Sequence, residues 1–317
     1  IENKKFPKWN ILLDEVLVES HSYNSWFTIN YLRLSLKNWS NTLKENIIFD
    51  WLSKYQIEDK SSKKIAIIMA GNIPAVGFHY LLCSLLLNFN CIVKLSSDDK
   101  LLIPFIVKFL ESRNNNLKSK VIFESETLKN FDGVIATGNN NSHRYFDYYF
   151  SKYPTILRKT RHSIAVLDGN ESDTDLSELS NDIFNYFGLG CRSVSKVFIP
   201  RGYDLDLLFN AFFRHKGVVN HNKYVNNFDY NKAVYLMSKQ KFIENGFIIL
   251  KEDPKLGSPI GCLFYEFYDN NEEITELIKN NSESIQCVAS NMNFDTNIKF
   301  GQAQCPNISD YADNNYT

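Results

Sequence analysis

The stretch Lys63–Pro74, KKIAIIMAGNIP, decides the fold class of this chain. Two lysines precede an apolar run of strand length, Ile65–Met69, and Gly71 follows soon after it. This is the pattern of a strand that is buried on both faces of a parallel sheet. A Gly-Asn-Ile-Pro turn then leads into a long apolar helix over about residues 76–88. Strand, turn and helix in this order predict the first unit of an alternating α/β fold.

The alternation continues along the chain. Further strands are expected at 91–94, 121–123 and 133–137, and helices at 101–112 and 142–149. Strands separated by helices of this length predict βαβ units and a largely parallel sheet, in which ligands bind at the carboxyl ends of the strands. Three loops follow such strand ends: Gly71-Asn72, Lys94–Ser97 and Thr137-Gly138. We therefore expect these loops to converge on one edge of the sheet.

Composition and pattern also predict what flanks this region. Residues 1–62 have the spacing of amphipathic helices and are expected to form a helical N-terminal appendage. A second α/β unit is expected after the polar turn Asp168-Gly169-Asn170, over residues 169–284. Residues 285–317 are expected to contribute strands that return to the core. These boundaries leave residues 63–168 as the first α/β domain.

The bulk properties exclude several classes of partner. The formal net charge is −1 and no basic stripe stands out, so neither a nucleic acid nor a charged membrane surface is indicated. The longest apolar run, Tyr80–Asn88, is too short to span a membrane. The six cysteines are widely spaced and lack a metal-ligand pattern. We therefore expect no metal site, and a cytoplasmic protein with reduced thiols.

Cys191 is the strongest candidate for a chemical role. It lies in Tyr186–Pro200, YFGLGCRSVSKVFIP, behind a turn that contains Gly188 and Gly190 and directly before Arg192. Glycines let the backbone approach a substrate closely, and an adjacent cation favours the thiolate over the thiol. These features indicate a nucleophile. The alternative interpretation is a small buried thiol at the entrance of a strand.

Several phrases of the chain resemble the aldehyde dehydrogenase superfamily, and most closely its LuxC-like acyl-CoA reductase branch, typified by the fatty-acid reductase of bacterial luminescence. They are the Cys191 run, Arg161–Gly169 (RHSIAVLDG), Phe300–Pro306 (FGQAQCP) and Asp310–Asp313 (DYAD). The resemblance covers about residues 63–313. It implies an aldehyde-dehydrogenase-like α/β fold, with a Rossmann-type dinucleotide-binding domain at 63–168 and a catalytic domain at 169–284.

The resemblance also assigns roles to single residues. Asn72 matches the asparagine whose amide, with the Cys191 backbone N–H, stabilises the oxyanion; read alone, Asn-Ile-Pro indicates only a turn. Lys94 matches the lysine that reaches the adenosine ribose, although a lysine at a strand end is commonly just exposed. Thr137-Gly138-Asn139 matches the turn that contacts the cofactor diphosphate, at a helix N-terminus.

The cofactor expected from the resemblance is NADP(H). Relatives that prefer NAD often place a glutamate three residues after the lysine, and here that position is Ser97. Without the carboxylate a 2′-phosphate is not repelled, and the hydroxyl groups of Ser96 and Ser97 can donate to it. We therefore expect NADPH to be preferred over NADH. The neighbouring carboxylates of Asp98 and Asp99 count against this preference.

An absent carboxylate indicates the direction of the reaction. Hydrolytic relatives carry a general-base glutamate before the catalytic cysteine, and counting back 34 residues from Cys191 lands on Leu157. No carboxylate lies between Tyr148 and Val166. Because activation of water needs such a base, an S-acyl cysteine would survive to be reduced. The alternatives are a hydrolytic, aldehyde-oxidising dehydrogenase and a non-catalytic, acyl-binding scaffold.

The resemblance therefore predicts reduction of an acyl thioester to an aldehyde through an S-acyl cysteine. Arg192, His221 and Lys223 are candidates for contacts with substrate or for proton transfer. Acyl-CoA or another acyl thioester, and CoA, are the expected ligands. By analogy with the family we also expect acyl-transferring partner proteins and a homo-oligomer.

Overall fold

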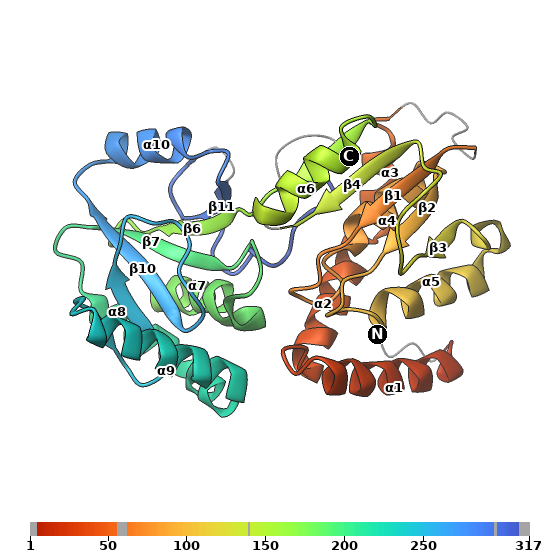
Figure 1. The fold of residues 1–317 in the computed structure, drawn as a ribbon. Coiled ribbons are helices and arrows are strands. Elements are labelled where there is room, and N and C mark those ends of the chain that lie inside the picture. Colours follow the sequence, from red (N-terminus) through yellow and green to blue (C-terminus); the bar gives the residue numbers. More distant parts are fainter. Residues whose placement is uncertain (1–4, 56–61, 139, 295–296, 311–317) are drawn as a thin grey trace. The chain divides into compact units, whose positions relative to one another are not determined.

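The computed structural model describes residues 5–55, 62–138, 140–294 and 297–310. The chain divides into two compact units, each with its own sheet (Figure 1). The first unit comprises Ile1–Thr160 and Asn307–Thr317, and the second comprises Arg161–Pro306. An alternating α/β fold with parallel sheets, as predicted from the sequence, is confirmed.

The first unit is built on a five-stranded parallel sheet of order β3-β2-β1-β4-β5. Its strands are β1 (Lys64–Ile68), β2 (Asn90–Lys94), β3 (Val121–Phe123), β4 (Gly133–Thr137) and β5 (Thr155–Arg158). Its helices that follow β1 are α4 (Phe78–Leu86), α5 (Leu102–Arg113), the short 3-10 helix Asn115–Leu117 and α6 (Asn140–Phe150). With β1 in the centre, the strand order reverses between β1 and β4, where α/β sheets of this kind bind their ligands.

The N-terminal helices are part of the core of the first unit. They are α1 (Pro7–Tyr23), α2 (Ile29–Thr42) and α3 (Glu45–Leu52). Leu17, Leu32 and Trp51 are fully buried and belong to the same hydrophobic cluster as Ile67 of β1 and Phe78 of α4. The helical character predicted for this region is confirmed, and its packing makes it a layer of the unit.

The second unit is built on a seven-stranded sheet of order β12-β11-β6-β7-β10-β9-β8. Its strands are β6 (His162–Val166), β7 (Val194–Pro200), β8 (Ile243–Glu244), β9 (Ile249–Glu252), β10 (Cys262–Tyr268), β11 (Ile285–Ala289) and β12 (Asn297–Ile298). Its helices are α7 (Asp173–Phe184), α8 (Leu205–Phe212), α9 (Asn222–Met237), α10 (Asn271–Asn280) and the 3-10 helices Asn185–Gly188 and Phe213–Asn220. Only β8 runs antiparallel to its neighbour.

The division between the units falls at 160/161, whereas the sequence predicts a boundary at 168/169. Strand β6 accounts for the difference, because it pairs with β7 and β11 and so belongs to the second sheet. At the other end, β11 and β12 join this sheet, while Ile308 packs into the core of the first unit. The Nε2 of His79 lies 2.8 Å from the Ile308 carbonyl oxygen.

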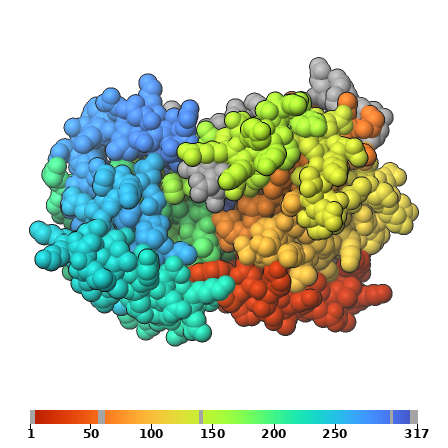
Figure 2. Space-filling view, viewed as in Figure 1, coloured from red at the N-terminus to blue at the C-terminus, as the bar shows by residue number. Residues whose placement is uncertain are grey.

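Helix α6 separates its aromatic side chains between two faces. Phe146 and Phe150 pack against the cluster of β1, β2 and β4 side chains, whereas Tyr145, Tyr148 and Tyr149 are exposed. Helix α6 contributes to the yellow-green surface of Figure 2. Among the described residues, no helix is both long enough and apolar enough to cross a membrane.

Candidate active site

Three predicted cofactor loops leave the same edge of the first sheet. Ile68, the last residue of β1, lies opposite Lys94 of β2 and Ala136 of β4, and all three strands are parallel. The loops that follow these strands carry Asn72, Lys94–Ser97 and Thr137-Gly138. Their convergence, expected from the sequence, follows from this register.

The loop that carries Asn72 is fixed from two sides. The Ser35 hydroxyl of α2 donates to the Pro74 carbonyl oxygen (2.7 Å), and Asp99 Oδ2 accepts the Ala75 N–H (2.8 Å). Ala75 has a left-handed backbone (φ 55°) and is fully buried, whereas Asn72 is exposed. Burial raises the pKa of Asp99 to about 6, against the lowering effect of two backbone N–H donors. The loop therefore presents Asn72 from a rigid base.

The residues after β2 differ in how they face solvent. Lys94 Nζ donates to the Glu126 carbonyl oxygen (3.0 Å), which places the ammonium group beside the strand end. Ser97 and Asp98 are exposed, and Ser96 Oγ accepts the Asp98 N–H (3.2 Å). The carboxylate of Asp99 is buried in the Asn72 loop. Of the two carboxylates that counted against NADPH, only Asp98 therefore faces solvent.

The turn after β4 has the features of a phosphate site. A Cβ on Gly138 would lie 2.8 Å from Ser142 Cβ and 2.9 Å from Phe146 Cε2, so only glycine allows α6 to start this close to the strand. The Thr137 hydroxyl is buried and makes no hydrogen bond with any described residue. The Gly138 N–H donates to the Arg158 carbonyl oxygen (3.3 Å), so the groups here that fit a dinucleotide diphosphate are the Thr137 hydroxyl and the backbone at the start of α6. Asn139 lies outside the described residues.

The turn before Cys191 is strained. Tyr186, Phe187 and Gly188 adopt left-handed backbone conformations in succession, with φ of 54°, 55° and 75°. For aromatic residues this conformation is costly and is found where the surroundings enforce it, often at functional sites. Tyr186 and Phe187 are 4% and 6% exposed, so their buried rings hold the turn in place. The sequence indicated the glycine turn but not the strain.

Cys191 itself is exposed at the end of this turn, just before β7. Protein atoms nonetheless crowd the thiol, and this desolvation raises the pKa of Cys191 above its usual value. The guanidinium groups of Arg192 and Arg161 lower the pKa but do not outweigh desolvation. The activating effect predicted for Arg192 is therefore present but is not the largest influence.

Residues of β6 and β11 pack beneath the turn that carries Cys191. The Ser163 hydroxyl donates to the Cys191 carbonyl oxygen (3.0 Å) and lies 3.0 Å from Cys287 Sγ. Ser163 is fully buried and Cys287 is 2% exposed. Burial raises the pKa of the Cys287 thiol, so this second thiol stays protonated beneath the turn. Sequence reasoning missed both residues.

The Phe300–Pro306 phrase lies against the same turn. Arg192 Nε donates to the Ala303 carbonyl oxygen (2.5 Å), and Gln304 Nε2 donates to Ser193 Oγ (3.0 Å). Through these contacts the Phe300–Pro306 phrase supports the turn that carries Cys191. Tyr311–Asp313, from the last phrase, lie outside the described residues.

His221 and Lys223 occupy the start of α9. The His221 Nδ1 accepts the Tyr224 N–H (3.3 Å) as the N-cap of the helix, and its ring packs on Phe187 with centroids 4.3 Å apart. Lys223 is exposed on the first turn. His221 is thus joined to the Cys191 turn through Phe187, and its Nδ1 is engaged as the cap of α9.

A small cavity of about 20 Å³ lies in the second unit beside the turn. Its lining includes Phe187, Gly188, Ser195, Tyr224 and Cys262. This volume holds a single water molecule at most and is too small for an acyl chain. Among the residues that the structure describes, no group of three or more His, Cys, Asp or Glu side chains could hold a metal ion.

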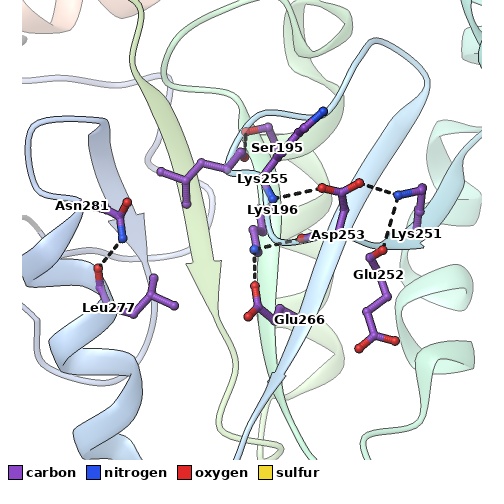
Figure 3. A network of polar contacts seen from close by, with 10 residues as sticks. Ser195, Lys196, Lys251, Glu252, Asp253, Lys255, Glu266, Leu277 and Asn281 are labelled. Atoms are coloured by element: carbon purple, nitrogen blue, oxygen red, sulfur yellow. Dashed lines mark hydrogen bonds and ion pairs between the residues drawn. The ribbon is translucent and has the colours of Figure 1, made fainter.

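A buried ion-pair network supports the strand that follows Cys191 (Figure 3). Lys196 is fully buried, and its Nζ donates to Glu266 Oε2 (2.5 Å) and to the Asp253 carbonyl oxygen (3.0 Å). The Asp253 carboxylate in turn accepts from Lys251. The network joins β7 to β10 and to the segment after β9. In the sequence, the signal for this network is Lys196, the single charged residue within the strand Val194–Pro200.

Glu266→Ala is expected to lower the free energy of unfolding by about 1–3 kcal/mol, because it leaves the buried ammonium group of Lys196 without its carboxylate. Glu266→Gln keeps an acceptor and is expected to lose less. Urea denaturation of both variants measures this. Asp269→Ala, which breaks the exposed pair with Arg201, is the control and should change little. Equal losses in all three variants would contradict a role for burial.

Comparison with known proteins identifies a sequence family. The family described as Acyl-CoA reductase (LuxC) matches residues 21–207, which include Asn72, the loops after β2 and β4, and Cys191. The match begins within the N-terminal helices, earlier than residue 63. No curated protein matches the chain.

Solved aldehyde dehydrogenases share the fold. The indole-3-acetaldehyde dehydrogenase AldA of P. syringae, a mutant in complex with NAD+ and IAA, has a TM-score of 0.56 at 12% identity, over 72% of this chain and 56% of its own. The Mycobacterium tuberculosis aldehyde dehydrogenase complexed with NAD+ has a TM-score of 0.61 at 12% identity, over 90% and 70%. Staphylococcus aureus AldH, in a substrate-bound state, has 0.56 at 14% identity, over 87% and 71%. The chain thus spans little more than half of AldA.

Proposed function

Since the chain belongs to the LuxC family of acyl-CoA reductases and has an aldehyde dehydrogenase fold, we propose that it reduces an acyl thioester, with acyl-CoA as donor, to the aldehyde with NADPH. The observation that carries this proposal is the turn before Cys191. It presents Cys191, an exposed residue, from two buried aromatic residues in a strained conformation. A strained turn of this kind lowers the stability of the fold and is not needed by a cysteine that only fills space in the core.

In the first step Cys191 acts as the nucleophile. Burial raises the pKa of the thiol, whereas the charges of Arg192 and Arg161 favour the thiolate, and the proton that the thiol gives up passes through solvent to the CoA that leaves. The sulfur then bonds to the acyl carbon, and the carbonyl electrons move to oxygen. The amide of Asn72 and the N–H of Cys191 donate to this oxyanion. Collapse breaks the bond to CoA, which leaves as a thiolate and takes up a proton.

In the second step the S-acyl group is reduced. A nicotinamide dinucleotide, when bound, would supply a hydride for the acyl carbon. Asn72 and the Cys191 N–H receive the oxyanion again, and its collapse breaks the carbon–sulfur bond to release the aldehyde. The backbone at the start of α6 and the Thr137 hydroxyl suit the diphosphate of the dinucleotide, and Lys94 suits its ribose.

The position at which hydrolytic relatives carry a general base holds no carboxylate in this chain, which supports reduction over hydrolysis. Leu157, at the position of that base, lies on strand β5. Glu171, the first glutamate after it, accepts the backbone N–H groups of Asp168 (2.6 Å) and Gly169 (3.2 Å). Its carboxylate is thus engaged in its own turn. An S-acyl cysteine without a base to activate water has time to accept hydride.

The direct test is NADPH consumption with a series of acyl-CoA chain lengths, together with detection of the aldehyde and of acyl groups on Cys191 by mass spectrometry. Aldehyde formation with an acylated Cys191 supports the reductase. Release of free acid without cofactor would instead identify a hydrolase. Neither turnover nor an adduct would leave a non-catalytic, acyl-binding scaffold.

Ser97→Glu is expected to raise the KM for NADPH about tenfold and to lower that for NADH, because the new carboxylate repels a 2′-phosphate and accepts from a 2′-hydroxyl. Asp98→Asn, which removes the adjacent exposed carboxylate, should strengthen NADPH binding. Steady-state kinetics with both cofactors measure the effect. A wild-type protein that prefers NADH would contradict the assignment.

The remaining parts of the proposal rest on the family and on composition. A cytoplasmic enzyme suits the wide spacing of its cysteines. Partner proteins that deliver or remove acyl groups, and assembly into a homo-oligomer, are expected by analogy alone.

A further inference from the structure

A buried carboxylate on α7, that of Asp182, holds the segment Phe300–Gln304. Asp182 is 1% exposed, and its two oxygens accept the N–H of Gly301 (2.7 Å) and of Ala303 (2.9 Å). Gly301 has a left-handed backbone (φ 81°), and a Cβ there would collide with the carboxylate of Glu178. The segment therefore fits closely on α7, with one carboxylate securing alternate residues of its backbone.

The same segment secures both neighbours of Cys191. The Ala303 carbonyl oxygen accepts from Arg192 Nε (2.5 Å). Gln304 Nε2 donates to Ser193 Oγ (3.0 Å), and that oxygen also accepts the N–H of Gly190 (3.2 Å). Ala303, Ser193 and Gln304 are 0%, 3% and 8% exposed, so water does not compete for these bonds.

The chemistry of the side chain is specific to this task. A carboxylate offers two acceptors in a fork, whereas an amide offers one acceptor and one donor, which would meet an N–H group. Burial also makes the charge costly, and raises the pKa of Asp182 to about 7. The charged neighbours of Asp182 are Glu178, which raises this pKa, and Arg192, which lowers it.

We propose that Asp182 is a positioning residue for Cys191, acting through Phe300–Gln304 on Arg192 and Ser193. It touches neither substrate nor cofactor. It fixes the backbone from which the thiol is presented, and keeps the Arg192 guanidinium beside it. The kinetic part of this inference rests on the proposed function, whereas its effect on thiol reactivity does not.

The test compares Asp182→Ala and Asp182→Asn with wild type in the full chain. Alkylation of Cys191 by iodoacetamide is followed against pH, with the Cys191 peptide quantified by mass spectrometry. Because Arg192 loses its anchor, we expect the pH midpoint for Asp182→Ala to rise by about half a unit to one unit. With acyl-CoA and NADPH, kcat should fall about tenfold to a hundredfold while KM changes less than about threefold. Asp182→Asn keeps one acceptor and should be intermediate.

Asp175→Asn is the matched control, because Asp175 lies on the same helix and caps it through Ser172. It should lower the melting temperature but leave the alkylation midpoint and kcat unchanged. If Asp182→Ala does not fold, Asp182→Asn and Gln304→Leu carry the test, since the latter removes the contact with Ser193 and leaves Asp182 in place. An unchanged midpoint in these variants, with a lower melting temperature alone, would overturn the inference. A shifted midpoint in a protein whose wild type turns over no acyl-CoA would refute the proposed function and leave the positioning role standing.

Discussion

Cys191→Ser is expected to lower kcat for acyl-CoA reduction by at least about a thousandfold, because a serine hydroxyl is a much weaker nucleophile than a thiolate and cannot form the S-acyl intermediate. The fold should survive, since Cys191 is exposed and the replacement is small. Aldehyde formation and acylation of the protein, measured on the same samples, check both parts of the expectation.

Cys305→Ser supplies the control, because Cys305 is the other exposed cysteine of the chain. It should retain both turnover and the adduct on Cys191. Full activity in Cys191→Ser would remove the nucleophile from the proposed mechanism. Loss of turnover with an acyl group on another cysteine would mean that the nucleophile had been assigned to the wrong residue.

Asn72→Ala is expected to lower kcat by about a hundredfold to a thousandfold, since it removes one of two donors to the oxyanion. Binding of NADPH, measured by fluorescence titration, should be unchanged, because in the proposed mechanism Asn72 contacts the acyl oxygen and not the dinucleotide. Asn72→Asp should lose at least as much, because a carboxylate repels the developing negative charge.

Ser35→Ala tests whether the loop must be rigid for Asn72 to act. It removes the donor to the Pro74 carbonyl oxygen but leaves the amide of Asn72 in place. A smaller loss of kcat than in Asn72→Ala is expected. If Asn72→Ala and wild type turned over equally, the oxyanion would have to be held by other donors.

The strands that could be predicted are those formed by apolar runs, including β3, an edge strand whose Ile122 and Phe123 are exposed. Strands β1, β2 and β4 are continuous apolar runs, and the structure places them within one or two residues of the expected bounds. Strand β5 was not predicted, because it is a short edge strand that follows Pro154 and is largely exposed at its start. Such a strand lacks the apolar run that marks its neighbours.

The domain boundary and the supports of the site depend on contacts between distant parts of the chain. Nothing near β6 indicates that it pairs with β11 instead of extending the first sheet. Asp182 reads as one polar residue of an amphipathic helix, and its partner Ala303 lies 121 residues away. By contrast, Cys191 and Asn72 lie in short motifs whose function can be inferred from the neighbouring residues alone. The sequence could therefore indicate the reactive groups, whereas the residues that support them could be identified only from the folded structure.

The long separation between Cys191 and its supports has a consequence for synthesis of the chain. Arg192 and Ser193 meet partners that lie 111 residues later, and β6 waits for β11 to complete its pairing. A nascent chain grows from its N-terminus, and contacts of high sequence separation form late. While residues 285–304 are still within the ribosome, the thiol has emerged but its neighbours are not yet fixed. The turn that carries Cys191 is thus completed only after residues 285–304 have been translated, and a polypeptide truncated before them would lack these contacts to Arg192 and Ser193.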